Sequence, residues 1–268
     1  MLDRGVLHQA EKRADPALPF RKIKDDLQAD ILFGNLESVI SDKGFDQGGP
    51  YSFRAPPKMI EGLTLAGFDV LSIANNHSFD WTVDALVDTK ERLKSEEIVP
   101  VGGGLEAYSP KVVKKKGYKF AFIAHTAIGS PGWASTETIP GVAWYSEEKL
   151  KEAIEEVKGE VDLIIFSIHY GTEYQTEPNQ NQIDISKGAI DAGVDLVIGH
   201  HPHVVQPVEI YKDKIIAYSL GNFIFDQDFS EETMEGLILE VVVSNGKIVG
   251  YEKIETKMNS YFQPEIKK

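Results

Sequence analysis

The chain of 268 residues contains no cysteine. This absence excludes disulfide bonds and thiolate metal ligands, so any metal site must use histidine, asparagine and carboxylate side chains. No apolar run is long enough to cross a membrane, and the N-terminus lacks the apolar core of a signal peptide. We therefore expect the chain itself to be soluble.

Positive charge is scarce. Lysine and arginine total 28 against 42 aspartates and glutamates, which gives a formal net charge of -14. This balance argues against a nucleic-acid partner, whose phosphates the protein would repel. The densest basic run, 114–116, is predicted to be a solvated turn before a strand. An acidic protein that acts on an anionic substrate needs local positive charge, which bound metal ions can supply.

The alternation of short apolar runs with amphipathic stretches predicts one α/β domain over residues 1–268. A largely parallel sheet with helices on its faces follows from this alternation. The expected strands are 31–34, 70–74, 120–124, 163–168, 196–198 and 215–220. The expected helices are 20–28, 56–66, 82–95, 147–157 and 180–192.

The pattern changes near the C-terminus. Segments 237–243 and 247–254 flank the pair Asn245-Gly246, which strongly favours an antiparallel hairpin. Segments 45–55 and 126–141 are predicted to be long loops, and such loops often cover functional sites.

Three of the seven histidines lie within Gly199-His200-His201-Pro202-His203, directly after the apolar run 194–198. Alternate residues of an extended segment project to the same side, so His201 and His203 could direct two imidazoles to one point. Imidazole is the commonest protein ligand of transition metals. The motif indicates half of a metal site, with His200 pointing away toward a supporting or substrate-contacting role.

Polar side chains follow every expected strand, where the carboxyl ends of parallel strands form one rim that binds ligands. Together they predict a single site at this rim. The residues concerned are Asn35, Glu37, Asn75, Asn76, His77, Asp80, His125, His169, Glu173, His200, His201, His203, Asn222 and Asp226.

Each of these residues has a structural alternative. Asn76 could cap the following helix, and His77 could be a satisfied loop histidine. Glu37 could be an exposed loop carboxylate. We expect His125 to be structural or peripheral. Glu173, Asn222 and Asp226, on the same rim, are candidates for substrate binding. Their alternative role is hydrogen bonding that stabilises the fold.

The ordered series of motifs resembles the capsule-synthesis protein CapA family, which is linked to poly-γ-glutamate capsules and belongs to the calcineurin-like metallophosphatase superfamily. The matching segments are Asn35-Leu36-Glu37, 74–77 with Asp80, 169–171 with Glu173-Tyr174, 199–203 and 218–223. The resemblance spans Met1 to about Ile254. It implies a layered α-β-β-α sandwich with a metal site at the carboxyl ends of the strands.

The resemblance also implies roles for individual residues. Glu37 matches the bridging metal ligand, where the superfamily usually has aspartate, and Asn76 matches the asparagine ligand. His169 and His201 match ligands of the second metal, and His203 matches a ligand of the first. His77 corresponds to the proposed general acid, which Asp80 would orient, and His200 could stabilise developing charge. The ligand types suit Mn, Fe or Zn.

The match departs from the family at the N-terminus. Members usually open with a strand that ends in a metal-binding Gly-Asp pair, whereas Met1–Gly5 resembles the segment after it. We therefore expect the first strand to precede residue 1, and one occupied metal site at most, or a weak pair. The full-length protein is expected at the cell surface or membrane.

Three functions remain open for the site. The first is hydrolysis of a phosphoester by a metal-bound water. The second is that of a non-catalytic, metal-stabilised surface factor that binds the acidic polymer or a membrane-bound capsule synthase complex. The third is hydrolysis of γ-linked peptide bonds in poly-γ-glutamate.

Overall fold

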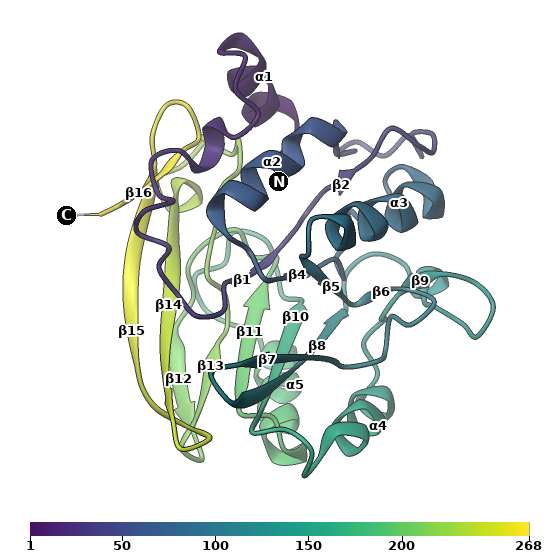
Figure 1. Cartoon of the computed structure of the whole chain (residues 1–268), viewed down its shortest axis with the longest axis vertical. Coiled ribbons are helices and arrows are strands. Elements are labelled where there is room, and N and C mark those ends of the chain that lie inside the picture. The colour runs from purple at the N-terminus through teal and green to yellow at the C-terminus, as the bar shows by residue number, and fades with distance from the viewer. Residues whose placement is uncertain (268) are drawn as a thin grey trace.

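The computed structural model describes residues 1–267, which build two β-sheets packed face to face (Figure 1). The first sheet consists of three parallel strands, β1 (Phe33–Asn35), β4 (Val70–Ser72) and β5 (Val99–Val101), in the order β1-β4-β5. The second sheet has the order β12-β13-β11-β10-β8-β7. Its strands are β7 (Lys111–Lys115), β8 (Tyr118–Thr126), β10 (Leu163–His169), β11 (Leu196–His200), β12 (Val208–Tyr211) and β13 (Lys214–Ala217).

Helices cover the outer faces of both sheets. Helices α2 (Ile60–Ala66) and α3 (Thr82–Ser95) pack on the first sheet, and α4 (Glu147–Val157) and α5 (Gln180–Ala192) pack on the second. The order of layers is helix, sheet, sheet, helix. This confirms the α-β-β-α sandwich expected from the family resemblance, and the central strands of both sheets are parallel.

Side-chain alternation along β10 explains both the packing and the position of the site. Ile164, Phe166 and Ile168 face helices α4 and α5, whereas Leu163 and Ile165 belong to the apolar layer between the two sheets. Successive side chains of a strand point to opposite faces. The last residue of β10, His169, therefore points toward the first sheet.

The predicted hairpin is confirmed. Strands β14 (Glu235–Ser244) and β15 (Lys247–Met258) pair antiparallel, and β16 (Pro264–Ile266) completes a third sheet. Asn245 and Gly246 both have positive φ, 51° and 69°. That conformation matches the right-handed twist of the flanking strands, which is why this dipeptide favours a tight hairpin.

The remaining elements are short. Strands β2 (Val39–Ile40) and β3 (Arg54–Ala55) pair with each other, as do β6 (Gly103–Gly104) and β9 (Gly141–Val142). The predicted loops 45–55 and 126–141 are irregular apart from β3, the start of β9 and a 3₁₀ turn at Pro131–Trp133. A further 3₁₀ turn occupies Glu232–Met234.

Three of the five predicted helices match the structure in their bounds, and 56–66 comprises a 3₁₀ turn at Pro57–Met59 followed by α2. The helix expected over 20–28 is wrong. Only a 3₁₀ turn at Leu18–Phe20 forms, followed by separate turns. Ile23 and Leu27, four residues apart, are both buried, as the helical pattern predicted. Successive turns bury these two side chains without forming a regular helix.

Helix α1 (Arg4–Lys12) and several short or edge strands, among them β5, β7 and β12, escaped prediction. The apolar residues of α1 lie on one face, with Val6 and Ala10 buried, so its sequence does carry a periodic signal. Strand β5 contains Pro100, which usually argues against a strand, but β5 lies at the edge of its sheet, where proline is tolerated. Within residues 1–267, no helix has both the length and the apolar character that crossing a membrane requires.

Candidate metal centre

The carboxyl ends of β1 and β10 and the turn after β11 meet at one rim between the two sheets. Glu37, His169 and His201 each offer a ligand atom there, and these atoms lie within 4.8 Å of one another. All three residues are buried. Residues separated by more than 160 positions along the chain thus form one compact cluster, as the position of the motifs after their strands had indicated.

Glu37 is the centre of this cluster. Its Oε1 lies 3.7 Å from His169 Nε2 and 3.5 Å from His203 Nε2. Its Oε2 accepts a hydrogen bond from Asn35 Nδ2 at 3.2 Å, which fixes the orientation of the carboxyl group. With an exposed fraction of only 6%, Glu37 is not the exposed loop carboxylate that we considered as its alternative.

The histidines after β11 converge by a route that differs from the expected one. His201 and His203 have positive φ, 100° and 58°, so the segment is a tight turn and not an extended strand. Their rings nevertheless lie 5.8 Å apart, and His201 lies 5.0 Å from His169. Just before this turn, Gly199 lets the backbone of β11 approach that of Tyr218 closely, because a Cβ at position 199 would lie 2.0 Å from the carbonyl oxygen of Tyr218.

The cluster contains an unusual concentration of buried polar atoms without a hydrogen-bond partner in residues 1–267. Such atoms are costly unless a ligand, ion or water satisfies them. A carboxylate oxygen, and one of the two ring nitrogens of a neutral imidazole, could donate a lone pair to a cation. The atoms are Glu37 Oε1, His201 Nδ1 and both ring nitrogens of His169, and Asn76 Oδ1 on the loop after β4 likewise lacks a partner.

The electrostatics of the cluster suit a cation. Burial acts to raise the pKa of the Glu37 carboxyl, but the neighbouring histidines, led by His169, outweigh it and lower the pKa to about 2. Burial lowers the pKa of His169 well below its usual value and that of His201 to about 4. At neutral pH the carboxylate is therefore ionised and these imidazoles are neutral, which are the forms that bind metals.

A second group of possible ligands shares His201. Glu173, His201 and His203 also have ligand atoms within 4.8 Å of one another, but Glu173 is exposed. His203 is held by its Nδ1, 3.0 Å from Asn222 Oδ1, so its Nε2 points to Glu37. The two histidines therefore differ, because His201 belongs to both groups and His203 to the second group alone.

The two asparagines after β4 have different environments. Asn75 is fully buried, and its side-chain nitrogen donates to Asn35 Oδ1 and to the carbonyl of Leu36, so it ties the two loops together. Asn76 caps no helix, because the next helix, α3, begins only at Thr82. The capping alternative for Asn76 is therefore wrong.

His77 and Asp80 form a close pair, with 2.7 Å between His77 Nδ1 and Asp80 Oδ2. The same carboxylate oxygen accepts a hydrogen bond from the backbone N–H of Phe53, whose ring packs 4.1 Å from that of His77. Both contacts leave His77 Nε2 as the free ring nitrogen. The loop does turn back so that Asp80 can orient His77.

Asn222 and Asp226 are engaged within the protein, which favours hydrogen bonding over their predicted role in substrate binding. Asn222 contacts His203, and its amide donates to Gln227 Oε1 and the carbonyl of Thr233. Asp226 forms an ion pair with Arg4 and accepts from the backbone N–H of Gly5 at 2.8 Å. Asn222 thus positions His203, and Asp226 positions the N-terminal segment at Arg4 and Gly5.

The two remaining histidines of the motifs lie apart from the ligand groups. His200 is the last residue of β11, its ring lies 6.3 Å from that of Phe33, and burial lowers its pKa to about 4. His125 is fully buried between Tyr108, Tyr145 and Phe166, and burial lowers its pKa to about 3. Its structural environment agrees with our expectation for His125.

No role was predicted for Tyr174, although the pair Glu173-Tyr174 carried part of the family resemblance. Its ring stacks on that of His203 at 6.1 Å, and its hydroxyl accepts a hydrogen bond from Gln227. Burial, followed by the charge of Glu173, raises the pKa of Tyr174 to about 12. Its place in that motif was the sequence signal, and its backbone has a positive φ of 62°.

The layered α-β-β-α fold and the histidine–carboxylate cluster define a protein with a candidate metal centre between two sheets. The chain belongs to the bacterial capsule synthesis protein PGA_cap family, whose model matches residues 1–227.

Two curated relatives are similar over most of the chain. It is 32% identical over 227 residues to the PGA biosynthesis protein CapA of Bacillus subtilis, covering 81% of this chain and 59% of the relative. It is 31% identical over 242 residues to the capsule biosynthesis protein CapA of Bacillus anthracis, covering 86% and 59%. The chain thus spans about three fifths of the length of these relatives.

A solved structure shares the fold. A hypothetical protein from Thermus thermophilus superposes with a TM-score of 0.57 at 15% identity, covering 91% of this chain and 93% of that chain.

Proposed function

We propose that this chain is a metal-dependent hydrolase of the phosphoester class that serves poly-γ-glutamate capsule synthesis. The observation that carries the proposal is the buried group Glu37, His169 and His201, whose ligand atoms converge and lack partners in the described part of the chain. Membership of the capsule synthesis family supplies the biological context.

The residues fit a divalent transition metal. One carboxylate and two neutral imidazoles form a nitrogen and oxygen donor set that suits Mn, Fe or Zn, and the family resemblance adds the amide oxygen of Asn76. A bound ion would supply a Lewis acid and lower the pKa of a water molecule, which makes hydroxide available near neutral pH. It would also offset the negative charge of the protein toward an anionic substrate.

His77 is the proposed proton donor to the leaving group. Its Nε2 is free to donate, and the Asp80 carboxylate beside Nδ1 holds the orientation of the ring. When Nε2 gives its proton to the leaving oxygen, Asp80 keeps the remaining proton on Nδ1. His77 is then ready to accept a proton from solvent for the next turnover.

We propose one tightly bound ion per chain. The group around Glu37 is fully buried, whereas the second group depends on the exposed Glu173 and shares His201 with the first. A second ion is therefore expected to bind weakly. Equilibrium metal analysis that finds two tightly held ions would contradict this expectation.

The rival function is non-catalytic binding of the acidic polymer or of a capsule synthase complex at the cell surface. It is suggested by the names of the relatives, which refer to biosynthesis and to no reaction. A hydrolase of γ-linked peptide bonds would use the same residues. Glu173 would then contact the substrate at the open side of the rim.

The test measures metal binding and two activities on the same preparation. The metal-stripped chain is titrated with Mn²⁺ or Zn²⁺ by calorimetry, then assayed with a generic phosphodiester and with poly-γ-glutamate. Glu37→Gln is the site variant, and Glu148→Gln, an exposed carboxylate on α4, is the matched control.

Four outcomes are distinguishable. Phosphodiester turnover that needs both metal and Glu37 supports the proposal. Cleavage of the polymer alone would identify the γ-peptide hydrolase, and metal binding without either activity would favour the binding role. Failure to bind metal would overturn all three.

A further inference from the structure

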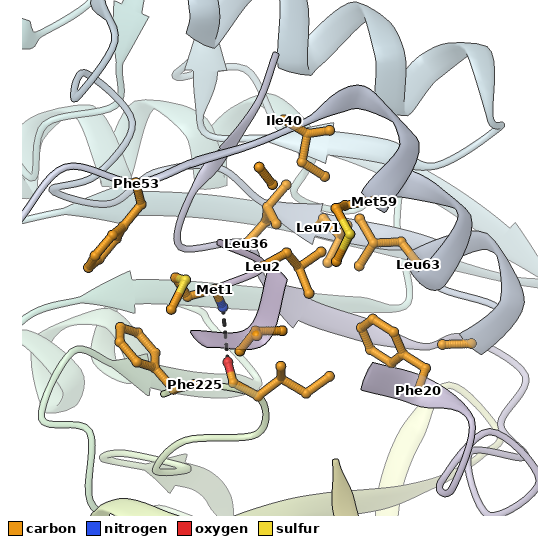
Figure 2. Packing of buried hydrophobic residues seen from close by; sticks show 14 of the residues in the cluster. Met1, Leu2, Phe20, Leu36, Ile40, Phe53, Met59, Leu63, Leu71 and Phe225 are labelled. Atoms are coloured by element: carbon orange, nitrogen blue, oxygen red, sulfur yellow. Dashed lines mark hydrogen bonds between the residues drawn. The ribbon is translucent and has the colours of Figure 1, made fainter. Parts of the chain in front are cut away.

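Lys90 lies where helix α3 is expected to present an apolar side chain. It follows Leu86 by four residues and precedes Leu93 by three, so the three side chains share one face of the helix. Leu86 and Leu93 belong to the first apolar cluster, part of which Figure 2 shows around Ile40 and Leu71. Lys90 itself is only 7% exposed. A lysine in such a position is rare, because lysines are almost never buried unless they are paired.

The backbone beside Lys90 leaves room for its long side chain. A Cβ at position 104 would lie 2.5 Å from Lys90 Nζ and 2.9 Å from its Cδ, so any larger residue there would displace the lysine. Gly104 also has a positive φ of 95°, which glycine adopts without strain. The stem of Lys90 therefore occupies a gap that Gly104 leaves between α3 and β6.

The ammonium group of Lys90 is poorly satisfied. Within residues 1–267 it forms no hydrogen bond, and Glu106 Oε2, at 3.8 Å, is too far away to accept one. The same oxygen accepts a hydrogen bond of 3.4 Å from Lys111 Nζ, and the Glu106 side chain is 65% exposed. The three N–H donors of a buried ammonium therefore face a single, loosely held carboxylate.

Lys90 faces a pocket of about 270 Å³ at the amino end of β5. Three ammonium groups against two carboxylates give this pocket a positive balance in a chain whose formal net charge is -14. Because β5 is parallel to β4 and β1, the pocket lies on the opposite side of the sheet from the candidate metal centre. Its lining is formed by Lys90, Lys94 and Lys111, by Glu97 and Glu106, and by residues 98–100.

The charges around Lys90 are unfavourable without a further anion. Lys94 lies one helical turn further along α3, and like charges at this spacing repel each other. Burial, followed by the charge of Lys94, lowers the pKa of the Lys90 ammonium, and Lys111 acts in the same direction. Glu106 and Glu91 oppose this effect without cancelling it. A second carboxylate close to Lys90 would stabilise its charge.

We propose that this pocket binds a carboxylate group of an acidic ligand between Lys90 and Lys111. Glu106 Oε2 marks the position, since it lies within 4 Å of both ammonium groups and shows that a carboxylate oxygen fits there. A ligand displaces the exposed Glu106 side chain and approaches Lys90 to hydrogen-bonding distance. A free acid and an acidic polymer both offer this group, and the experiment below distinguishes them.

The experiment is calorimetric titration of the metal-stripped chain with glutamate, with an oligomer of γ-linked glutamate and with inorganic phosphate. Without metal, the readout is independent of the proposed hydrolase activity. Lys90→Met removes the charge and keeps an apolar side chain between Leu86 and Leu93, a replacement that cores commonly tolerate. Lys151→Met, at an exposed position on α4, removes the same charge elsewhere and is the matched control.

We expect Lys90→Met to weaken binding of the carboxylate ligand by at least about tenfold, because it removes the buried partner of the ligand. Lys151→Met should leave the affinity unchanged. Glu106→Gln should have the opposite effect and tighten binding by about two- to fivefold, since the internal competitor loses its charge. Glu148→Gln on α4 adds the same charge difference and should not tighten binding.

The two carboxylate ligands identify the source of the group. Glutamate that binds as tightly as the oligomer identifies a free acid, and tighter binding of the oligomer identifies a polymer. Both results support the proposal when Lys90→Met weakens the binding.

Three results would overturn the proposal. They are absence of binding by either carboxylate ligand, equal affinities of Lys90→Met and Lys151→Met, and binding of phosphate alone. If Lys90→Met fails to fold, Glu106→Gln still decides, because Glu106 is a surface residue and its loss of charge must tighten binding. Unchanged or weaker binding by Glu106→Gln would show that no ligand competes for its position.

Discussion

His169 and His125 lie at the ends of adjacent parallel strands, both fully buried, yet only one belongs to the candidate metal centre. The register of β8 and β10 pairs His125 with Ile168, one residue before His169. His125 therefore shares the helix-facing side with Ile168, and His169 points to the opposite face, toward Glu37. A position after a strand is thus insufficient for a metal ligand, because the face of the sheet decides what the side chain can reach.

The largest effect is expected at His77, a buried histidine in the loop after β4. His77→Ala should lower turnover of a phosphodiester by about 10²–10⁴-fold, the usual contribution of a general acid. Metal content should stay intact, because His77 is bonded to Asp80 and lies outside the ligand groups. Steady-state kinetics and metal analysis of the same sample check this. Loss of metal together with activity would make His77 a ligand.

The contrast between His169 and His125 is tested by substituting each histidine separately. His169→Ala should weaken metal binding by at least about 10–100-fold, the loss that even a residue behind a ligand can cause. His125→Leu should leave the affinity unchanged, because aromatic rings surround His125. Calorimetric titration measures both. Equal losses in the two variants would refute the role of the sheet face.

Asp88 provides a second comparison, with Glu37 as the other buried carboxylate. Burial acts to raise the pKa of Asp88, but hydrogen bonds from Lys43, Ser41 and Arg92 outweigh it and lower the pKa. Asp88→Asn should therefore cost about 1–3 kcal/mol in the free energy of unfolding at neutral pH.

The sign of the pH dependence follows from this lowered pKa. The stabilisation by Asp88 is complete above the unfolded pKa of 3.8 and is lost as pH falls through the lower folded value. Denaturant melts at pH 7 and below pH 3.8 should show the difference from wild type shrinking. Asp228→Asn, at an exposed position, serves as the control and should show no such change.

The last comparison concerns the pH dependence of His125. Burial lowers its folded pKa to about 3 from 6.5, so the unfolded chain binds the extra proton between these values. Wild-type stability should fall as pH drops from 6.5 toward 3, by at most about 1.4 kcal/mol per pH unit from this group. His125→Leu should show a shallower decline in denaturant melts. An unchanged slope would mean that His125 accepts a proton in the folded protein.

Much of the fold could be predicted from local signals. Helices 82–95, 147–157 and 180–192 and the hairpin at Asn245-Gly246 match because periodicity and turn residues act over short distances. The prediction of a helix over 20–28 failed because buried positions four residues apart are compatible with successive turns as well. The division of the strands into two sheets came from the family resemblance, since strand order depends on contacts distant in sequence.

The amino-acid sequence by itself determined which chemistry is possible: without cysteine, the site is limited to histidine, asparagine and carboxylate ligands, placed after strands by the order of the motifs. Only the tertiary structure decided which of them meet. It joined Glu37 to His169, turned His201 and His203 together through left-handed backbone, and enclosed His125 among aromatic rings. The physical reason is that strand register and side-chain alternation assign each residue to a face, and these are fixed by packing between distant segments.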